Sequence, residues 1–289
     1  MPKKNAIILA AGTSSRFVPL SENTPKALLK VKGEILIERQ IRQLKEAGIS
    51  DITIVTGYKA EMFKYLEKDF GVRLIFNEDF ARYNNTSSLI RVLHLLDNTF
   101  VCSSDNYFCN NVFLNAPNKS FYSSLYSSVP SGEYFLSTDK EDRIYEVSIG
   151  ADKGWYMIGH VYFDSSFSKA FSKILYDEYE KEETRQGYWE DVYMRHIHTL
   201  PSLFIKRYSK DEIMEFDSLD ELRKFDHEYI NDTHSPIIKH IAERLQCREG
   251  NLWDFRRESS MNDSLEFSFL KEGDRYLYKS VDDSISLIK

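Results

Sequence analysis

The sequence predicts an α/β fold, a mostly parallel mixed sheet flanked by helices, with a small α+β appendage at the C-terminal end. Two patterns carry this prediction. Short, continuously apolar runs alternate with stretches of helical spacing through the first third, and such runs are typical of parallel strands covered on both faces. Near the end, two alternating segments flank Lys271-Glu272-Gly273-Asp274, which is a hairpin signal. A chain of 289 residues has room for one large domain and a small extra one.

The order of the elements gives the topology. Strands are expected at residues 6–10, 52–55, 72–76 and 100–102. Helices are expected around residues 37–44, 62–66 and 87–96, and Gly48 should end the first. This β-α-β-α order predicts a Rossmann-like, doubly wound sheet, in which ligands bind at the carboxyl ends of the strands.

The second half is less regular. Residues 121–163 read as strands, 167–183 as a helix, 187 onwards as another helix, and 204–208 as a strand. Ser218 is placed to cap a helix over 219–225, and Ser235 with Pro236 to start one whose apolar face ends near Leu245. Residues 231–234 resemble a linker. We therefore expect two domains, 1–230 and 231–289, the second a helix plus a hairpin.

Composition excludes several classes. The net charge of −7 gives no basic footprint for a nucleic acid. Three cysteines, an odd number without CxxC spacing, argue against a disulfide framework and suit a reducing cytoplasm. No stretch approaches the ~18 apolar residues of a membrane span, so no membrane insertion is expected.

The loop after the first strand, Leu9-Ala10-Ala11-Gly12-Thr13-Ser14-Ser15-Arg16, carries the clearest chemistry. Small residues let backbone N–H groups approach phosphates, and Arg16 adds a cation. Lys26 follows a rigid proline a little later, where it can meet a triphosphate. A tight strand-to-helix turn and a surface lysine are the plain alternatives. Together the two segments predict nucleoside triphosphate binding.

Three carboxylates are candidate metal ligands. Asp105 directly follows an apolar strand, and Glu215 and Asp217 alternate after another, so the latter two share a side if the chain is extended. Oxygen ligands of this kind favour Mg²⁺. A cap or turn role remains the alternative for each.

Two further groups point to a second ligand. The polar segment from Arg82 to Leu89 enters a helix, where its amides can read a base or an anion, or simply cap the helix. Aromatic residues in the second half are each expected in the core, yet as a set beside Glu190 and Asp191 they can form a cation-binding cage. They are Tyr134, Trp155, Tyr156, Tyr188 and Trp189.

With these residues in hand, the chain resembles the sugar-nucleotide pyrophosphorylase superfamily and, within it, the bacterial CTP:phosphocholine cytidylyltransferases. The resemblance spans residues 6 to about 226. It rests on the stretches AIILAAGTSSRFVPLSENTPKALLKV, GISDITIVTGY, VRLIFNEDFARYNNTSSL, SSDNYF, GYWED and EFDSLDELRKF. It implies a nucleotidyltransferase, GT-A-like fold in the cytoplasm, a part in decorating the cell surface with choline, and Mg²⁺ as cofactor.

The resemblance also implies residue roles. Catalysis is assigned to Lys26, Arg16 and Asp105, and the metal to Asp105, Asp217 and Glu215. Nucleotide binding is assigned to Leu9, Ala10, Ala11, Gly12, Thr13, Arg16, Lys26, Gly57, Tyr58, Asn85, Ser87 and Ser104. The amine of the substrate is assigned to Tyr134, Trp155, Tyr188, Trp189 and Glu190. Phosphocholine enzymes carry Asp-Asn where this chain has Glu190-Asp191, and Trp where it has Tyr134, which leaves the acceptor open.

The expected reaction transfers CMP from CTP to phosphocholine and releases pyrophosphate. One alternative acceptor is another small phosphorylated amine, an aminophosphonate or a sugar phosphate. A non-catalytic nucleotide sensor or scaffold is the alternative of another class. The tail from Ser235 resembles the start of a choline/ethanolamine-kinase N-lobe, with Lys279 on its second hairpin strand, but lacks any kinase catalytic loop. We expect it to be a truncated or decayed fusion or an interaction module, offering a surface for a homodimer or a kinase partner.

Overall fold

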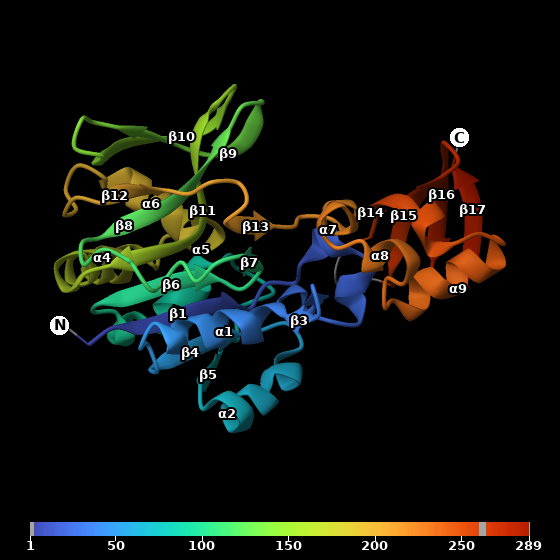
Figure 1. Ribbon diagram of the computed structural model, residues 1–289, viewed down its shortest axis with the longest axis horizontal. Coiled ribbons are helices and arrows are strands. Elements are labelled where there is room, and N and C mark those ends of the chain that lie inside the picture. The colour runs from blue at the N-terminus through green and yellow to red at the C-terminus, as the bar shows by residue number, and fades with distance from the viewer. Residues whose placement is uncertain (1–2, 260–263, 289) are drawn as a thin grey trace. The chain divides into compact units, whose positions relative to one another are not determined.

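The computed structural model describes residues 3–259 and 264–288, which form two compact units (Figure 1). The first unit comprises the chain up to Gly12 together with Leu36–Met214. The second comprises Thr13–Ile35 and the residues from Glu215 onwards. The sequence-predicted boundary near residue 230 falls inside the second unit and remains a prediction about where a domain ends.

The first unit is built on one mixed sheet. Over the described residues this sheet has nine strands, in the order β10-β9-β11-β6-β1-β4-β5, with β8 beside β11 and β12 beside β8. The strands are β1 (Asn5–Ala10), β4 (Ile52–Thr56), β5 (Arg73–Phe76), β6 (Thr99–Ser103), β8 (Phe121–Ser127), β9 (Ser131–Thr138), β10 (Ile144–Ala151), β11 (Gly154–Phe163) and β12 (Phe204–Arg207). The strands β6, β1, β4 and β5 run parallel, as predicted.

The other half of the sheet is mainly antiparallel, and its one parallel pair among the described residues is β8 with β12. Strand β11 pairs antiparallel with β6, β8 and β9, and its register shifts between Met157 and Val161. Gly159 lies in that shift at φ 58°, and a Cβ there would stand 1.8 Å from Asn106 Oδ1. Only glycine fits this position, because the position requires a left-handed φ and leaves no space for a side chain.

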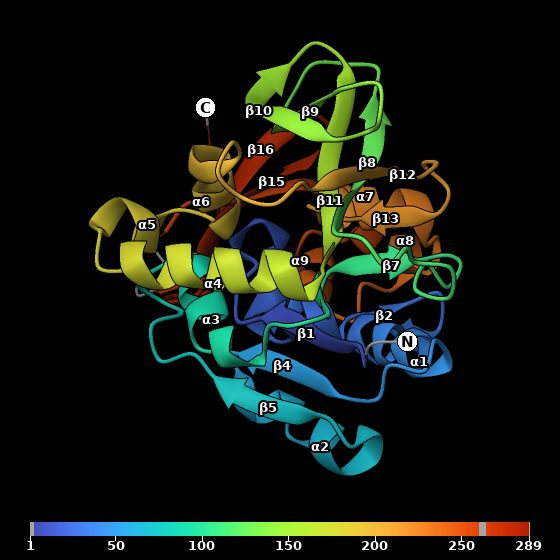
Figure 2. The same cartoon turned by 90° about the vertical axis from the view of Figure 1, so that its left-hand side faces the viewer.

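Helices cover both faces of the sheet, as Figure 2 shows for α4 and α1. The helices of the first unit are α1 (Leu36–Glu46), α2 (Tyr65–Phe70), α3 (Thr86–Ile90), α4 (Ser165–Glu178), α5 (Glu182–Gln186) and α6 (Trp189–His196), with 3₁₀ turns η4 (Ala60–Phe63) and η5 (Leu93–Leu95). Helix α1 is tied to the sheet by Gln40 Nε2, which donates to the Ser103 carbonyl at 3.0 Å. On the other face, the rings of Phe163, Phe167, Phe171 and Trp189 form an aromatic core.

Two predicted helices are shorter than expected. The helix predicted over 87–96 ends at Ile90, because Val92 leaves helical geometry at φ −122° and ψ 13°, and the chain continues as a 3₁₀ turn. The helix predicted over 167–183 is divided into α4 and α5 by Lys181, which is extended at ψ 130°. Apolar residues continue through the first break, and the second lies in the polar stretch 180–186, where no apolar pattern marks a helix end.

The second unit joins an early loop to the C-terminal part of the chain. Its loop elements are η1 (Ser15–Phe17), η2 (Leu20–Glu22), η3 (Lys26–Leu28), β2 (Lys30–Val31) and β3 (Glu34–Ile35). Its C-terminal elements are α7 (Leu219–Phe225), α8 (Glu228–Asn231), α9 (Pro236–Arg244), η6 (Glu249–Asn251), β14 (Trp253–Arg257), β15 (Glu266–Lys271), β16 (Asp274–Lys279) and β17 (Ser284–Ile288). The short strand β13 (Ile213–Glu215), which pairs with β7 (Asn106–Phe108), leads into it.

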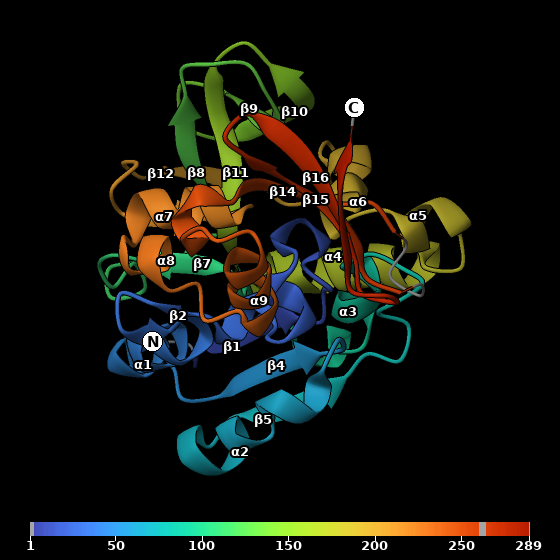
Figure 3. The same ribbon diagram turned by 90° about the vertical axis from the view of Figure 1, so that its right-hand side faces the viewer.

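The C-terminal strands form an antiparallel sheet in the order β14-β15-β16-β17, seen with α9 in Figure 3. The predicted caps are present: Ser218 accepts from Glu221 N, and Ser235 from Ile238 N, each at 3.3 Å. The predicted hairpin is β15–β16, with Gly273 at φ 95° in its turn. The appendage is therefore a folded helix-and-sheet layer with its own buried residues, among them Phe267 and Phe269.

Candidate functional site

The first unit brings three predicted loops to one edge of the sheet. Leu9 pairs with Ser103 across β1 and β6, and Ala10 pairs with Thr56 across β1 and β4, so the loops after these parallel strands emerge side by side. Tyr58 N donates to the Ala11 carbonyl at 3.1 Å. The carboxyl edge of the sheet, where α/β folds bind ligands, thus carries Ala10–Gly12, Gly57–Tyr58 and Ser104–Asp105.

Gly57 allows this close approach of loops. A Cβ at this position would lie 2.5 Å from Phe80 Cβ and 2.8 Å from the Ala11 carbonyl oxygen. Any side chain would push the two loops apart. Gly12, in contrast, is exposed, and an added Cβ would meet nothing within 4 Å. The space above Gly12 suits a ligand that approaches the backbone, which is what the sequence predicts for a phosphate.

The second unit holds the predicted cations on the Thr13–Ile35 loop. Arg16 donates to both oxygens of Asp217, with Nη1–Oδ2 at 3.0 Å and Nη2–Oδ1 at 2.9 Å. The Lys26 amine lies 3.9 Å from Asp217 Oδ1 and 5.6 Å from the centre of the Phe17 ring. The side chain of Lys26 is only 7% exposed, whereas that of Arg16 is 76% exposed. The fold thus brings together Arg16, Lys26 and Asp217 from segments far apart in the sequence.

A cluster of tyrosines and carboxylates lies on the first unit and consists of Tyr122, Tyr134, Tyr188, Glu190 and Asp191. The Tyr122 hydroxyl donates to Glu190 Oε1 at 2.9 Å, and the Tyr134 hydroxyl to Asp191 Oδ1 at 2.8 Å. The rings of Tyr134 and Tyr188 meet edge to face, 6.2 Å apart. Both carboxylates therefore stand beside aromatic rings, an arrangement that suits a positively charged ligand.

The electrostatics of this cluster are unusual. Burial raises the pKa of Glu190 to about 7, although hydrogen bonds from Tyr122 and Asn85 work in the opposite direction. Burial and the hydrogen bond to Asp191 likewise raise the pKa of the Tyr134 hydroxyl. A carboxyl group held near neutrality is favoured in its ionised form when a cation comes close. A cation that came close to Glu190 would therefore favour loss of its proton.

Asn85 connects the predicted Asn-rich loop to this cluster. Its side-chain oxygen accepts from Trp189 N at 2.9 Å, and its Nδ2 donates to Glu190 Oε2 at 3.3 Å. Asn85 makes no side-chain cap bond to α3. Ser87, which the sequence assigned with it, is buried and donates to the Asn84 carbonyl at 2.7 Å. The structure therefore places Asn85 at the cluster and Ser87 in support of its loop.

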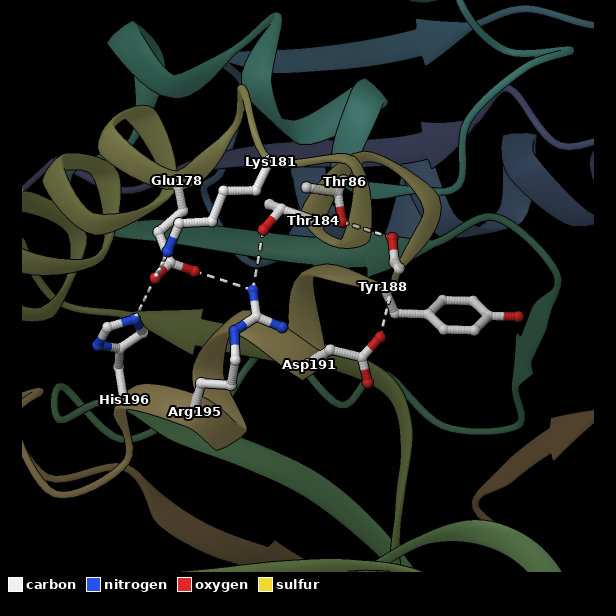
Figure 4. Close-up of polar contacts among 9 residues, drawn as sticks. Thr86, Glu178, Lys181, Thr184, Tyr188, Asp191, Arg195 and His196 are labelled. Carbon is white, nitrogen blue, oxygen red and sulfur yellow. Dashed lines mark hydrogen bonds and ion pairs between the residues drawn. The ribbon is translucent and has the colours of Figure 1, made fainter.

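Figure 4 shows the polar contacts that hold the start of α6. Asp191 Oδ2 accepts from Tyr188 N at 2.8 Å, and the Thr86 hydroxyl donates to the Gly187 carbonyl at 2.7 Å. Further along, Glu178 of α4 takes hydrogen bonds from three basic side chains, those of Lys181, Arg195 and His196. Burial opposes ionisation of Glu178, but these partners outweigh it and lower its pKa to about 2. Helices α4, α5 and α6 are thereby fixed together.

The two predicted tryptophans contact tyrosine rings other than those of Tyr134 and Tyr188. Trp189 is 3% exposed, and its ring stacks on Tyr122 at 5.7 Å within the core, so it supports the cluster from behind. Trp155 of β11 contacts the Tyr126 ring at 5.4 Å, with the Arg207 guanidinium over its face. Sequence reasoning did not find Tyr122, whose only signal was its place in a strand-like stretch.

Among the described residues, no group of three or more His, Cys, Asp or Glu side chains is arranged as a metal cage. Asp105 follows β6 on the first unit, and Asp217 follows β13 on the second, where exposed Glu215 precedes it. Magnesium is commonly held by one or two carboxylates together with the phosphates of a bound nucleotide. Each of these side chains offers oxygen donors of the kind that magnesium takes.

Comparison with known proteins decides the family. The model for the MobA-like NTP transferase domain matches residues 6–124. A choline-phosphate cytidylyltransferase of Streptococcus pneumoniae is 36% identical over 76% of this chain and 96% of the relative. The chain belongs to this nucleotidyltransferase family.

Other members of the family extend the comparison. A 2-aminoethylphosphonate cytidylyltransferase of Lancefieldella rimae is 34% identical over 79% of this chain and 94% of its own length. A solved structure of CTP:phosphocholine cytidylyltransferase from S. pneumoniae superposes with a TM-score of 0.75 and 36% identity, covering 78% of this chain and 99% of that chain. The predicted nucleotidyltransferase fold is confirmed, and the two relatives and the solved structure cover 76%, 79% and 78% of this chain.

Proposed function

We propose that this nucleotidyltransferase transfers CMP from CTP to phosphocholine, giving CDP-choline and pyrophosphate. The tyrosine–carboxylate cluster carries the proposal. A quaternary ammonium group cannot donate hydrogen bonds, so it is recognised by aromatic faces and negative charge. Tyr134 and Tyr188 supply the rings, and Glu190 and Asp191 the charge. The names of the S. pneumoniae relatives support the same acceptor.

The proposed reaction needs no general base. An oxygen of the phosphocholine phosphate bonds to the α-phosphorus of CTP, the bond from that phosphorus to the β-phosphate oxygen breaks, and pyrophosphate leaves with the electron pair. A phosphate dianion is already nucleophilic at neutral pH. Catalysis then rests on orientation and on neutralisation of the phosphate charge.

The roles of the chain's residues follow from this demand. Arg16 and Lys26 are proposed to bind the triphosphate, and the Ala10–Gly12 and Gly57–Tyr58 loops to bind the nucleoside and phosphate backbone. Ser104 and Thr13 border these loops. A bound Mg²⁺ would neutralise phosphate charge and polarise the leaving group. Asp105, Asp217 and Glu215 are the carboxylates proposed to hold it, an assignment that comes from the family resemblance and that single substitutions can test.

An aminophosphonate is the second candidate acceptor. The L. rimae relative is named for 2-aminoethylphosphonate. A primary ammonium group donates hydrogen bonds, and the carboxylates of Glu190 and Asp191 could accept them. Each of these carboxylates already accepts a hydrogen bond from a tyrosine hydroxyl. The two acceptors differ in three methyl groups on nitrogen and in the linkage at phosphorus, so direct competition distinguishes them.

The testing experiment is pyrophosphate release from the full chain over a matrix of substrates. CTP and UTP are each paired with phosphocholine, phosphoethanolamine, 2-aminoethylphosphonate and a sugar 1-phosphate. We expect the highest kcat/KM with CTP and phosphocholine. A higher kcat/KM for 2-aminoethylphosphonate would replace the proposed acceptor, and no release with any pair would favour a nucleotide sensor or scaffold.

Two further properties are proposed with the function. All three cysteines are free, which suits a reducing compartment, and we propose the cytoplasm. In the described part of the chain, no helix combines the length and the apolar character needed to cross a bilayer. The proposed homodimer or kinase partner would use the C-terminal appendage.

A further inference from the structure

The described part of the appendage, residues 236–259 and 264–288, shares a compact unit with the Thr13–Ile35 loop. The S. pneumoniae relative covers 76% of this chain, and the sequence stretches that resemble the family end near residue 226. The appendage is therefore an addition to the family fold. It nevertheless packs with the loop that carries Arg16 and Lys26, the two cations proposed to bind the triphosphate. The contacts between the appendage and this loop indicate how the appendage acts on the loop.

One of these contacts is an ion pair between Arg257 and Glu22. Arg257 ends β14, and Glu22 ends η2, which lies between Arg16 and Lys26 in the loop. The side chains are 9% and 21% exposed, so the pair is shielded from water and stronger than an open surface pair. Arg257 Nε also donates to the Ser259 carbonyl at 3.1 Å, which fixes the guanidinium from a second side. The turn η1 lies against β14 as well.

The loop needs such anchors because it has little regular structure of its own. Its described elements are 3₁₀ turns and one two-residue strand pair, each with few backbone hydrogen bonds. Beyond Lys26, the residues just before the appendage hold the loop at two more points. The Tyr229 hydroxyl donates to the Lys30 carbonyl at 3.0 Å, and Lys32 N donates to Asp226 Oδ2 at 2.6 Å. Anchors thus stand on both sides of Lys26.

We propose that the appendage is a positioning element for nucleotide binding, and that Arg257 acts through Glu22 to hold Arg16 and Lys26 where they meet the triphosphate of CTP. This proposal depends on the proposed function in one respect, namely that the nucleotide bound is CTP. Arg257 and Glu22 are positioning residues, since neither belongs to the predicted binding set. A small displacement of a cation from a phosphate weakens binding strongly, because charge-assisted hydrogen bonds depend on geometry.

The test compares CTP affinity and steady-state kinetics of the full chain with those of Arg257→Met and Glu22→Gln. We expect the Kd and KM for CTP to rise about tenfold in both variants, with the KM for phosphocholine changed less than twofold. Arg257→Lys should restore part of the affinity. Arg256→Met is the matched control: Arg256 is the neighbouring residue on β14, 64% exposed and paired with Asp254. It should leave the Kd for CTP unchanged.

Several outcomes would overturn the proposal. One is an unchanged Kd for CTP in Glu22→Gln, a variant that keeps the side-chain shape and therefore decides the matter even if Arg257→Met does not fold. Another is an equal loss in Arg256→Met. Direct CTP binding needs no acceptor, so it separates this proposal from the function: if the wild type turns over a different triphosphate, that triphosphate replaces CTP in the same comparison.

Discussion

Arg16 and Asp217, 201 positions apart, form a two-point ion pair in which both terminal guanidinium nitrogens reach the carboxylate. Lys26 approaches the same carboxylate at 3.9 Å. One acidic side chain therefore orders the two cations that are proposed to bind the triphosphate. Its substitution should affect activity far more than stability.

Asp217→Asn is expected to lower kcat/KM for CTP by at least about 100-fold. The variant loses a proposed metal ligand and the carboxylate charge that holds Arg16 and Lys26 in place. The free energy of unfolding should change by about 1 kcal/mol or less, because the partly exposed pair contributes little. Pyrophosphate release and thermal unfolding measure the two effects. Asp211→Asn, at an exposed carboxylate, is the control. Near-normal turnover in Asp217→Asn would refute its catalytic assignment.

The two cations should be separable by kinetics. Lys26→Met removes a buried charge and is expected to lower kcat about 100-fold or more, as loss of transition-state stabilisation does. Arg16→Lys keeps the charge but not the two-point geometry, so we expect mainly a higher KM for CTP. Steady-state kinetics at saturating phosphocholine give both constants. Equal effects of both variants on KM alone would show that neither cation acts selectively on the transition state.

Acceptor binding should depend on pH through Glu190. The pKa of about 7 lies above the usual 4.5, so the folded protein retains this proton between these values. Stability from this group therefore falls as pH rises through that window, and cation affinity rises until about pH 7 and then levels off. Calorimetric titration with phosphocholine from pH 5.5 to 8.5 measures the affinity.

Glu190→Gln isolates that dependence, because the phosphate of the ligand itself titrates near 6. The variant should bind phosphocholine more weakly at pH 8 and lose the part of the pH dependence that Glu190 causes. Identical pH profiles for the wild type and the variant would contradict the role of Glu190.

Two substitutions at Tyr134 should report on the acceptor. Tyr134→Phe keeps the ring and removes the hydroxyl that holds Asp191, whereas Tyr134→Ala removes both. For a quaternary ammonium ligand we expect Tyr134→Phe to retain most phosphocholine affinity and Tyr134→Ala to lose about tenfold. The KM for CTP is the internal control and should stay constant. A loss as large in Tyr134→Phe as in Tyr134→Ala would favour recognition through hydrogen bonds.

Gly57→Ala should destabilise the first unit, because its new methyl group would overlap Phe80 and the Ala11 carbonyl. We expect a loss of about 1–3 kcal/mol, seen as a lower Tm. Gly12→Ala, which has free space around the added Cβ, is the stability control. Equal Tm values for the two variants would show that the loops can separate without cost.

The sequence by itself determined the local elements and the chemistry of the main motifs. Apolar runs identified β1, β4 and β6, since a strand buried on both faces must be apolar throughout, and the same signal located the half-exposed edge strand β5. Cap residues such as Ser218 and Ser235 identified helix starts, because their hydroxyls accept from backbone N–H groups that the helix leaves unpaired. The loop from Leu9 to Arg16, with Lys26 after it, indicated a triphosphate. These signals are local in the chain.

Only the tertiary structure decided which distant residues meet. Nothing in the sequence indicated that Asn85 bonds to Glu190 or that Tyr122 supports the same carboxylate. The pairing of Arg257 with Glu22, 235 positions apart, was equally hidden. Side-chain pairs of this kind depend on how strands order themselves in a sheet and how loops fold back over long separations. The loops that carry Arg16 and Lys26 were therefore readable as motifs, while the residues that hold them in place were not.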